Sequence, residues 1–310
     1  ELTMTPEEWW KNFALGMEID AAGTFIYNGI RSLHELPTLN HPVDSLEVLY
    51  NLSVGIERLL KVAIILVEHN DQVDIAQFEE SLISHSTIDL ANRVDSQRTL
   101  ALSNVHREFL SILSKFYKSH RYGRYSLSAV PEIYEEKRLL LEFVSKHLKI
   151  GLPVKDEFFP IQNTDQIRRF VGKVVKKICR ETFRVVSQRA CELNIYTSEI
   201  RGDSKALKVF YGERLDFVEE EFKKKELLLF LMSDKSKGPH KDLLIAVGAL
   251  DLDPAMVPSY IQALLNDAHL LYVEGEVDEL YTEVADVRER LNFLRIMDSE
   301  YLSYGKEDEA

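Results

Sequence analysis

Apolar residues recur at helical spacing through almost the whole chain, and runs of strict alternation are hard to find. In the segment 42–69 one helical face carries Leu46, Leu49, Ser53, Ile56, Leu60, Ile64 and Val67. This period indicates amphipathic helices rather than half-buried strands. The 310 residues include only 13 Gly and 9 Pro, so few positions interrupt a helix. We therefore predict an all-α fold, with further helices at 5–33, 75–94, 97–120, 128–148, 164–197 and 277–302.

A break in the helical pattern predicts how the chain divides. The stretch IGLPVKDEFFPIQNTDQ places Gly151, Pro153 and Pro160 close together, and such clusters stop helices and often mark boundaries. A chain of this length is also long for a single core. We expect an N-terminal helical bundle at 1–150, a region of long helices at 162–232, and a smaller module at 233–305.

Charge, cysteines and hydropathy limit the classes of protein to consider. The net charge of −13 argues against a surface that binds nucleic acid all over, but it leaves local basic patches open. Cys179 and Cys191 lie too far apart on one predicted helix for a disulfide, so we expect reduced, buried thiols and a cytoplasmic protein. The most apolar stretch, LLKVAIILV, is too short to span a membrane, and TPEEWWKNF does not resemble a secretory signal.

No motif for a cofactor or metal is legible in the sequence. There is no glycine-rich phosphate loop and no dinucleotide-binding fingerprint. The nine His are scattered, without the paired or Cys-containing spacing of a zinc site. We therefore predict that the protein uses neither a cofactor nor a metal ion.

Three motifs between 42 and 127 together suggest a family. GIERLLKVAIIL carries Glu57 and Lys61 four residues apart, LISHSTIDLANRV carries His85 shortly before an Asp-Leu pair, and FYKSHRYGRY carries Arg121 followed by Tyr122. These motifs resemble HEPN domains, which are helical bundles common in prokaryotic toxin and defence systems. The resemblance covers less than a third of the chain. It implies a HEPN-like bundle and an RNA-related role.

The resemblance also implies a catalytic arrangement. Active HEPN ribonucleases pair an Arg with a His that follows it closely, in a site shared between the two chains of a dimer, and they cleave RNA without a metal. After Arg121 the corresponding positions hold Tyr125, Ser126 and Leu127, and His120 precedes the Arg. The catalytic candidates are therefore His120, Arg121 and Tyr125, in a homodimer, and whether the protein is an enzyme stays open.

Two interpretations of the stretch 116–127 remain. Two guanidinium groups near a helix end can hold a phosphate, and Tyr122 can stack on a base beside Arg124. Alternatively, Tyr and Arg side chains here close the bundle, and Arg121 pairs with a buried Glu57. The first interpretation makes this stretch a site for nucleic acid, and the second makes it a structural element.

The clearest electrostatic feature is the segment 168–189, with eight basic residues and a single acid, Glu181. At 100° per residue, an arc of about 100° contains Arg169, Lys173, Lys176, Lys177, Arg180 and Arg184. We call these six residues the basic ridge. We expect it to lack the neutralising acids that usually stand four residues from a helical cation. It then binds nucleic acid, docks an acidic partner, or receives the chain's own acidic end, where residues 272–310 hold twelve acids and four basic residues.

Residues 225–276 resemble a winged helix-turn-helix, with a third helix at 255–267 and a strand that turns into a wing at Gly275. That third helix offers Ser259, Gln262 and Asn266 but no basic residue, so the module fits a protein contact better than DNA reading.

Taken together, these features predict a HEPN-like protein that binds RNA or another nucleic acid, as an RNase or its degenerate relative, in a prokaryotic defence or toxin system. The alternative is a non-catalytic helical adaptor that assembles partner proteins through its C-terminal module.

Overall fold

The computed structural model describes residues 9–68, 74–117, 135–152, 160–195 and 204–296. The chain forms two compact units, 1–218 and 219–310. The described residues are helical apart from turns, loops and one isolated bridge between Thr38 and Gln162, which confirms the all-α prediction. None of the described helices is long and apolar enough to cross a bilayer.

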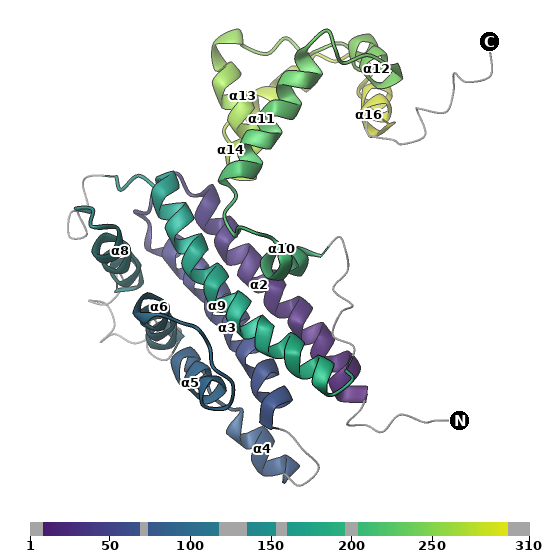
Figure 1. Cartoon of the computed structure of the whole chain (residues 1–310). Helices are drawn as coiled ribbons and strands as arrows, with labels where there is room; N and C mark the ends of the chain where they lie inside the picture. The colour runs from purple at the N-terminus through teal and green to yellow at the C-terminus, as the bar shows by residue number, and fades with distance from the viewer. Residues whose placement is uncertain (1–8, 69–73, 118–134, 153–159, 196–203, 297–310) are drawn as a thin grey trace, which may run out of the picture. The chain divides into compact units, whose positions relative to one another are not determined.

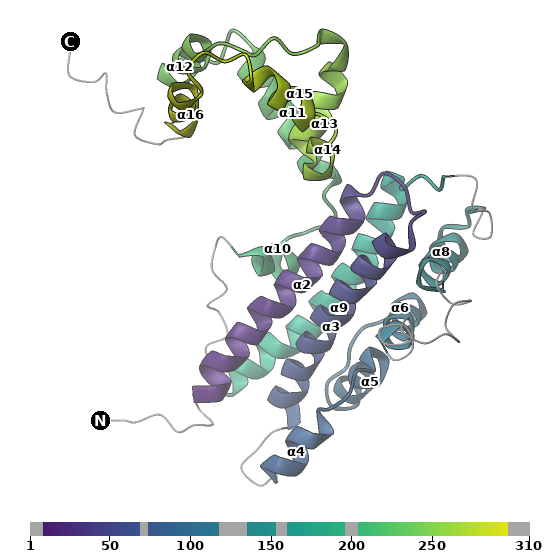
Figure 2. The same cartoon turned by 180° about the vertical axis from the view of Figure 1, so that it is seen from behind.

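Three long helices form the centre of the first unit. They are α2 (Leu15–Glu35), α3 (Pro42–Glu68) and α9 (Asp165–Glu192), and they lie side by side in both views (Figures 1 and 2). The core consists of their apolar faces, in which Ile26, Ile56 and Val175 are fully buried. Burial of these side chains removes a large apolar area from water, the main stabilising contribution to such a bundle.

Shorter helices cover the two sides of this centre. On one side lie α4 (Ile75–Ser81), α5 (Thr87–Gln97), α6 (Asn104–Lys115) and α8 (Glu135–Leu148). On the opposite side α10 (Lys205–Tyr211) packs against α2 and α9 (Figures 1 and 2). A short π-helix, η1 (Trp10–Ala14), precedes α2.

Three predicted helices differ from those observed, and the last of them, at 277–302, is interrupted at residues 282–286. The segment 75–94 is divided into α4 and α5, because the chain becomes extended at Ser86, which precedes the first residue of α5. The segment 97–120 becomes helical only at Asn104, since Ser103 and the N3 residue His106 form a capping box there. Residues 98–103 are therefore not helical, and Thr99 and Ala101 of this segment contact α9.

The division between the units lies later in the chain than the predicted break at 151–160. Ile161, Ile167 and Val171, which follow that break, belong to the same buried cluster as α2 and α3. The predicted break at 151–160 thus falls within the first unit. Of the two cysteines, both in α9, Cys179 is buried as expected, whereas Cys191 is exposed.

The second unit is built from short helices. They are α11 (Val218–Met232, which begins at the boundary), α12 (Pro239–Val247), η4 (Pro254–Met256), α13 (Val257–Leu265), α14 (Asp267–Leu270), α15 (Glu274–Tyr281) and α16 (Val287–Ile296). The predicted strand and wing are wrong. Gly275 lies in the first turn of α15, and residues 225–276 contain no strand, which a winged helix requires.

Candidate anion-binding pocket on helix α9

Helix α9 separates an apolar face from a basic one. Thr164 precedes it in an extended conformation, and Asp165 in its first turn complements the helix dipole. Val171, Val175 and Ile178 are buried in the core. On the other face Lys173, Arg180 and Arg184 are exposed and Arg169 is half-buried. The predicted ridge therefore exists as a helical face, but its six members differ in their surroundings.

A pocket of about 360 Å³ opens on this face. One wall is α9 and the other is the segment 213–216, which follows α10. Its charged lining consists of Arg169, Lys173, Lys176, Lys177, Arg180 and Arg214, with Glu213 and Asp216 as the acidic members. Basic side chains thus outnumber acidic ones around a concave site.

A glycine in α9 allows the two walls to approach. A Cβ on Gly172 would clash with the carbonyl oxygen of Leu215 and lie only 3.0 Å from its carbonyl carbon. The backbone at Leu215 therefore packs directly on the helix backbone. The sequence alone does not predict this wall, and its one signal there is a glycine in the middle of a long helix.

Lys176 has a structural role. It is only 8% exposed, and its Nζ donates to the carbonyl oxygens of Val209 at 2.7 Å and Phe210 at 3.3 Å. These carbonyls lie in the last turn of α10, where helical partners are missing. Burial lowers the pKa of Lys176, with the nearby Arg180 acting in the same direction. The ammonium group thus attaches α10 to α9, although the sequence predicted it on the solvent face.

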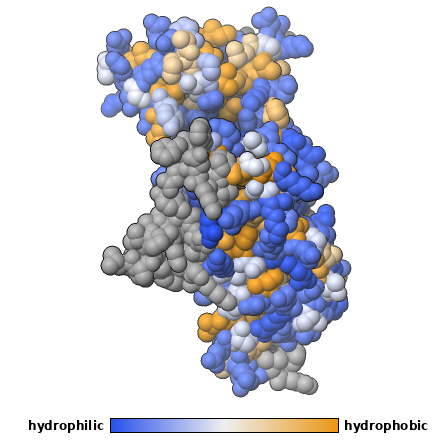
Figure 3. Space-filling model, turned by 90° about the vertical axis from the view of Figure 1, so that its left-hand side faces the viewer, coloured by the Kyte–Doolittle hydropathy of each residue, from blue (hydrophilic) through white to orange (hydrophobic). Residues whose placement is uncertain are grey.

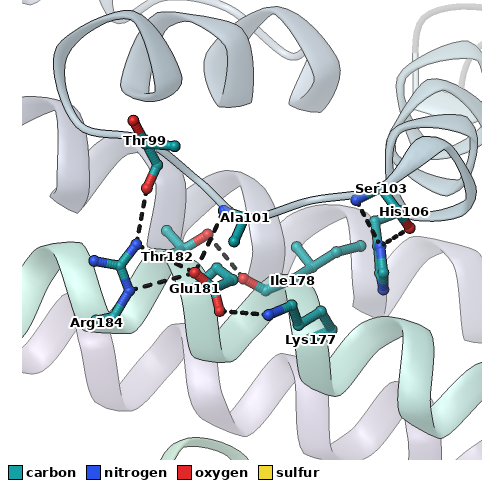
Figure 4. Close-up of polar contacts among 9 residues, drawn as sticks. All are labelled: Thr99, Ala101, Ser103, His106, Lys177, Ile178, Glu181, Thr182 and Arg184. Atoms are coloured by element: carbon teal, nitrogen blue, oxygen red, sulfur yellow. Dashed lines mark hydrogen bonds and ion pairs between the residues drawn. The ribbon is translucent and has the colours of Figure 1, made fainter.

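Glu181 neutralises two of the six cations of the basic ridge (Figure 4). Its carboxylate accepts from Lys177 Nζ at 2.6 Å and from Arg184 at 3.2 Å, and Arg184 also donates to the carbonyl oxygen of Thr99 at 2.8 Å. The backbone N–H of Ala101 also donates to the Glu181 carboxylate, at 3.4 Å. The expectation that no acid four residues away neutralises the ridge is therefore wrong for Lys177.

The pKa values of Glu181 and of the nearby His106 are both lowered in these surroundings. Burial opposes ionisation of Glu181, but the hydrogen bonds from Lys177 and Arg184 outweigh it and lower the pKa of its carboxyl group. Burial and the nearby Lys177 lower the pKa of His106, whose Nδ1 accepts from the N–H of Ser103 at 3.1 Å (Figure 4). His106 is thus neutral and Glu181 ionised at neutral pH.

Three ridge cations are left without an ionic partner. Among the described residues, Arg169, Lys173 and Arg180 make no ion pair. All three line the pocket. Their charges are therefore available to an anion, and a guanidinium can hold a phosphate or carboxylate through two parallel hydrogen bonds.

The structure does not describe the candidate site residues of the stretch 116–127. His120, Arg121, Tyr122, Arg124 and Tyr125 lie outside the described residues. The ion pair between Glu57 and Arg121 therefore remains a prediction.

Glu57 does have partners among the described residues. Its carboxylate accepts from Lys61 Nζ at 2.6 Å and lies 3.2 Å from His85 Nδ1. The ring of His85 stacks on Tyr117 with centroids 4.5 Å apart. The fold thus brings together the Glu, Lys and His of two of the motifs described above.

This cluster lines a second pocket, of about 540 Å³. Its other lining residues include apolar and aromatic side chains, Trp10 and Ile65 among them. A carboxylate at His85 Nδ1 can fix the ring tautomer and leave Nε2 for proton transfer, which is the chemistry this arrangement allows. The described residues contain no group of three or more His, Cys, Asp or Glu side chains arranged to hold a metal ion.

No family model, no curated protein and no solved structure matches this chain. The function of the protein is therefore inferred from the two pockets themselves.

Proposed function

We propose that this protein binds nucleic acid, RNA foremost, through the pocket on α9. The observation that carries the proposal is the set of three unpaired cations, Arg169, Lys173 and Arg180, on one concave surface of a chain whose net charge is −13. The helix holds the backbone positions of these three residues in a fixed array, so no backbone rearrangement is needed to bring the charges together. Phosphate groups are the anions that such arrays of Arg and Lys bind most often.

The salt dependence of affinity tests this proposal. Fluorescence anisotropy of a labelled single-stranded RNA should give a log Kd that changes by about 0.7 per log unit of salt for each phosphate contact, or about 2 for three contacts. The variant Lys173→Gln should reduce that slope by about 0.7. The control Lys223→Gln changes an exposed lysine of the second unit and should leave the slope unchanged. A parent slope near zero would contradict the proposal.

The HEPN-like character of 42–127 extends the proposal to RNA-binding proteins of the prokaryotic toxin and defence type. What supports this extension is the convergence of Glu57, Lys61 and His85 on one pocket. In this interpretation the protein is an RNase or its degenerate relative. Cleavage of a labelled RNA by the parent but not by Arg121→Ala would favour the RNase.

A second candidate function is a non-catalytic adaptor. It is favoured by the apolar surface of the second unit, where Leu229, Leu231 and Met232 of α11 are more than half exposed. Figure 3 shows hydrophobic residues among the hydrophilic ones on the visible face of this unit. Neighbouring large apolar side chains that are exposed together are typical of surfaces that bind other proteins.

Self-assembly is the simplest form of this candidate, and it matches the predicted homodimer. Sedimentation velocity at tens of micromolar should then show an oligomer for the parent and a smaller species for Leu229→Gln combined with Leu231→Gln. A parent that sediments as a monomer at this concentration would contradict the self-assembling form.

A further inference from the structure

The unpaired cations on α9 occupy a short stretch of the helix. Arg169 and Arg180 are eleven residues apart, which is about 17 Å along the axis. Glu181 holds Arg184, which lies beyond Arg180, and also Lys177, which lies between Lys173 and Arg180. The extended segment at Thr99 and Ala101 also contacts α9 there (Figure 4). The cationic surface is thus a local site rather than a track along the helix.

The pocket also has an enclosing wall. The backbone at Leu215 lies against Gly172, and the adjacent Glu213, Arg214 and Asp216 line the pocket opposite the α9 cations. Its volume of about 360 Å³ is near the lower limit for small-molecule sites. Such a pocket suits the compact anionic group at the end of a nucleic-acid strand. It suits an internal phosphate less well, because the nucleic acid would have to continue out of the pocket in both directions.

One donor in the pocket lacks an acceptor. The Nε of Arg169 is buried and has no hydrogen-bond partner among the described residues. A buried donor without an acceptor is costly, so a rotation of the Arg169 side chain that brings Nε to a bound phosphate oxygen would be favourable.

The acidic lining residues narrow the class of ligand. Asp216 Oδ1 accepts from the N–H of Val218 at 3.3 Å, while Glu213 is exposed at the rim. Carboxylates repel a bare polyanion but accept hydrogen bonds from the hydroxyl and amino groups of a nucleoside. The lining therefore fits a phosphate that is attached to a nucleoside.

We infer that the α9 pocket binds the terminal phosphate of a nucleic-acid strand, a phosphomonoester, in preference to an internal phosphodiester. The inference rests on the proposed function and names the part of the nucleic acid that is recognised. A terminal phosphate carries about −1.5 to −2 charges at pH 7, as in phosphorylated side chains, whereas each internal phosphate carries one. Three cations around one pocket therefore favour the end of the strand.

The test compares one internally labelled RNA with three kinds of end: a 5′-phosphate, a 3′-phosphate, or hydroxyls only. Anisotropy at fixed salt should show about tenfold tighter binding for one of the phosphorylated forms than for the hydroxyl form. Lys173→Gln should remove most of this ratio. Lys223→Gln, which changes an exposed lysine of the second unit, should preserve it. Circular dichroism shows that each variant is folded.

The outcomes separate the two claims. If all three RNAs bind the parent equally, the end preference is wrong while nucleic-acid binding stands. If none of them binds at low salt, both claims fail. If Lys223→Gln removes the ratio as fully as Lys173→Gln does, the terminal phosphate does not bind in the pocket as described.

Discussion

Gly172 of α9 lies directly against the backbone carbonyl of Leu215, with no room for a Cβ between them. This contact joins two segments that are more than forty residues apart in sequence, and it forms the wall of the α9 pocket. The pocket therefore depends on a residue that carries no charge.

Gly172→Ala should destabilise the protein and weaken RNA binding together. The clash is with backbone rather than a movable side chain, so the segment 213–216 has to shift, at a cost of about 1–3 kcal/mol. Urea unfolding and RNA anisotropy measure the two effects. The control is Gly16→Ala in α2, where nothing lies within 4 Å, and there the added helix propensity should leave stability equal or higher. A Gly172→Ala protein that is as stable as the parent would contradict the close contact.

Lys176 and Lys173 should give opposite results although they are three residues apart. Lys176→Met leaves the last carbonyls of α10 without their buried charged donor, so unfolding should become easier by about 1.5–3 kcal/mol. Lys173→Met removes an exposed cation, so RNA affinity should fall with little change in stability. Thermal melts with parallel binding curves measure both. Equal loss of stability in the two variants would argue against the buried role of Lys176.

The network around Glu181 predicts a pH-dependent stability. Because the folded-state pKa of Glu181 lies below its ordinary value of 4.5, its ion pairs stabilise the fold above that pH, and the contribution is lost as pH falls through the folded pKa. Glu181→Gln should lower the free energy of unfolding by about 1–3 kcal/mol near pH 7. Urea unfolding should show the gap between parent and variant shrinking toward about pH 3. A gap of the same size at both pH values would rule out the ionised Glu181.

Glu57 and Lys61 should be energetically coupled. A double-mutant cycle with Glu57→Gln and Lys61→Met should give a coupling of about 0.5–3 kcal/mol, since the Glu57 side chain is only 10% exposed. The matched control is Arg138 with Glu142, which has the same spacing but about half-exposed side chains, and its coupling should be at most about 0.5 kcal/mol. Similar coupling in both pairs would show that the Glu57 cluster is an ordinary surface pair.

The long helices were predictable from the sequence. The predicted segment 42–69 matches α3 to within a residue, and 164–197 matches the start of α9 but extends past its end. In both cases an apolar stripe with a constant helical period runs over many turns, and tertiary packing reinforces that pattern. The predicted strand before Gly275 includes the run HLLYV (269–273), which instead forms the end of α14 and the turn after it, because a short apolar run does not by itself specify a strand.

The pocket itself was not predictable from periodicity. The positions of Arg169, Lys173 and Arg180 on one face follow from helical geometry alone. The wall at 213–216 and the burial of Lys176 under α10 depend on contacts between segments distant in sequence, which helical period does not encode. The Lys177–Glu181 pair could have been found, because its spacing of four residues is a known signal.

The most direct measurement of the central claim is RNA binding by the triple variant Arg169→Glu, Lys173→Glu, Arg180→Glu. Its matched control, Lys223→Glu, Lys224→Glu, Lys235→Glu, changes the net charge by the same amount on exposed lysines of the second unit. We predict that the ridge variant remains folded and loses RNA binding, while the control binds within a few-fold of the parent. Equal loss of affinity in both variants, or unchanged affinity in the ridge variant, would contradict a nucleic-acid site at the α9 pocket.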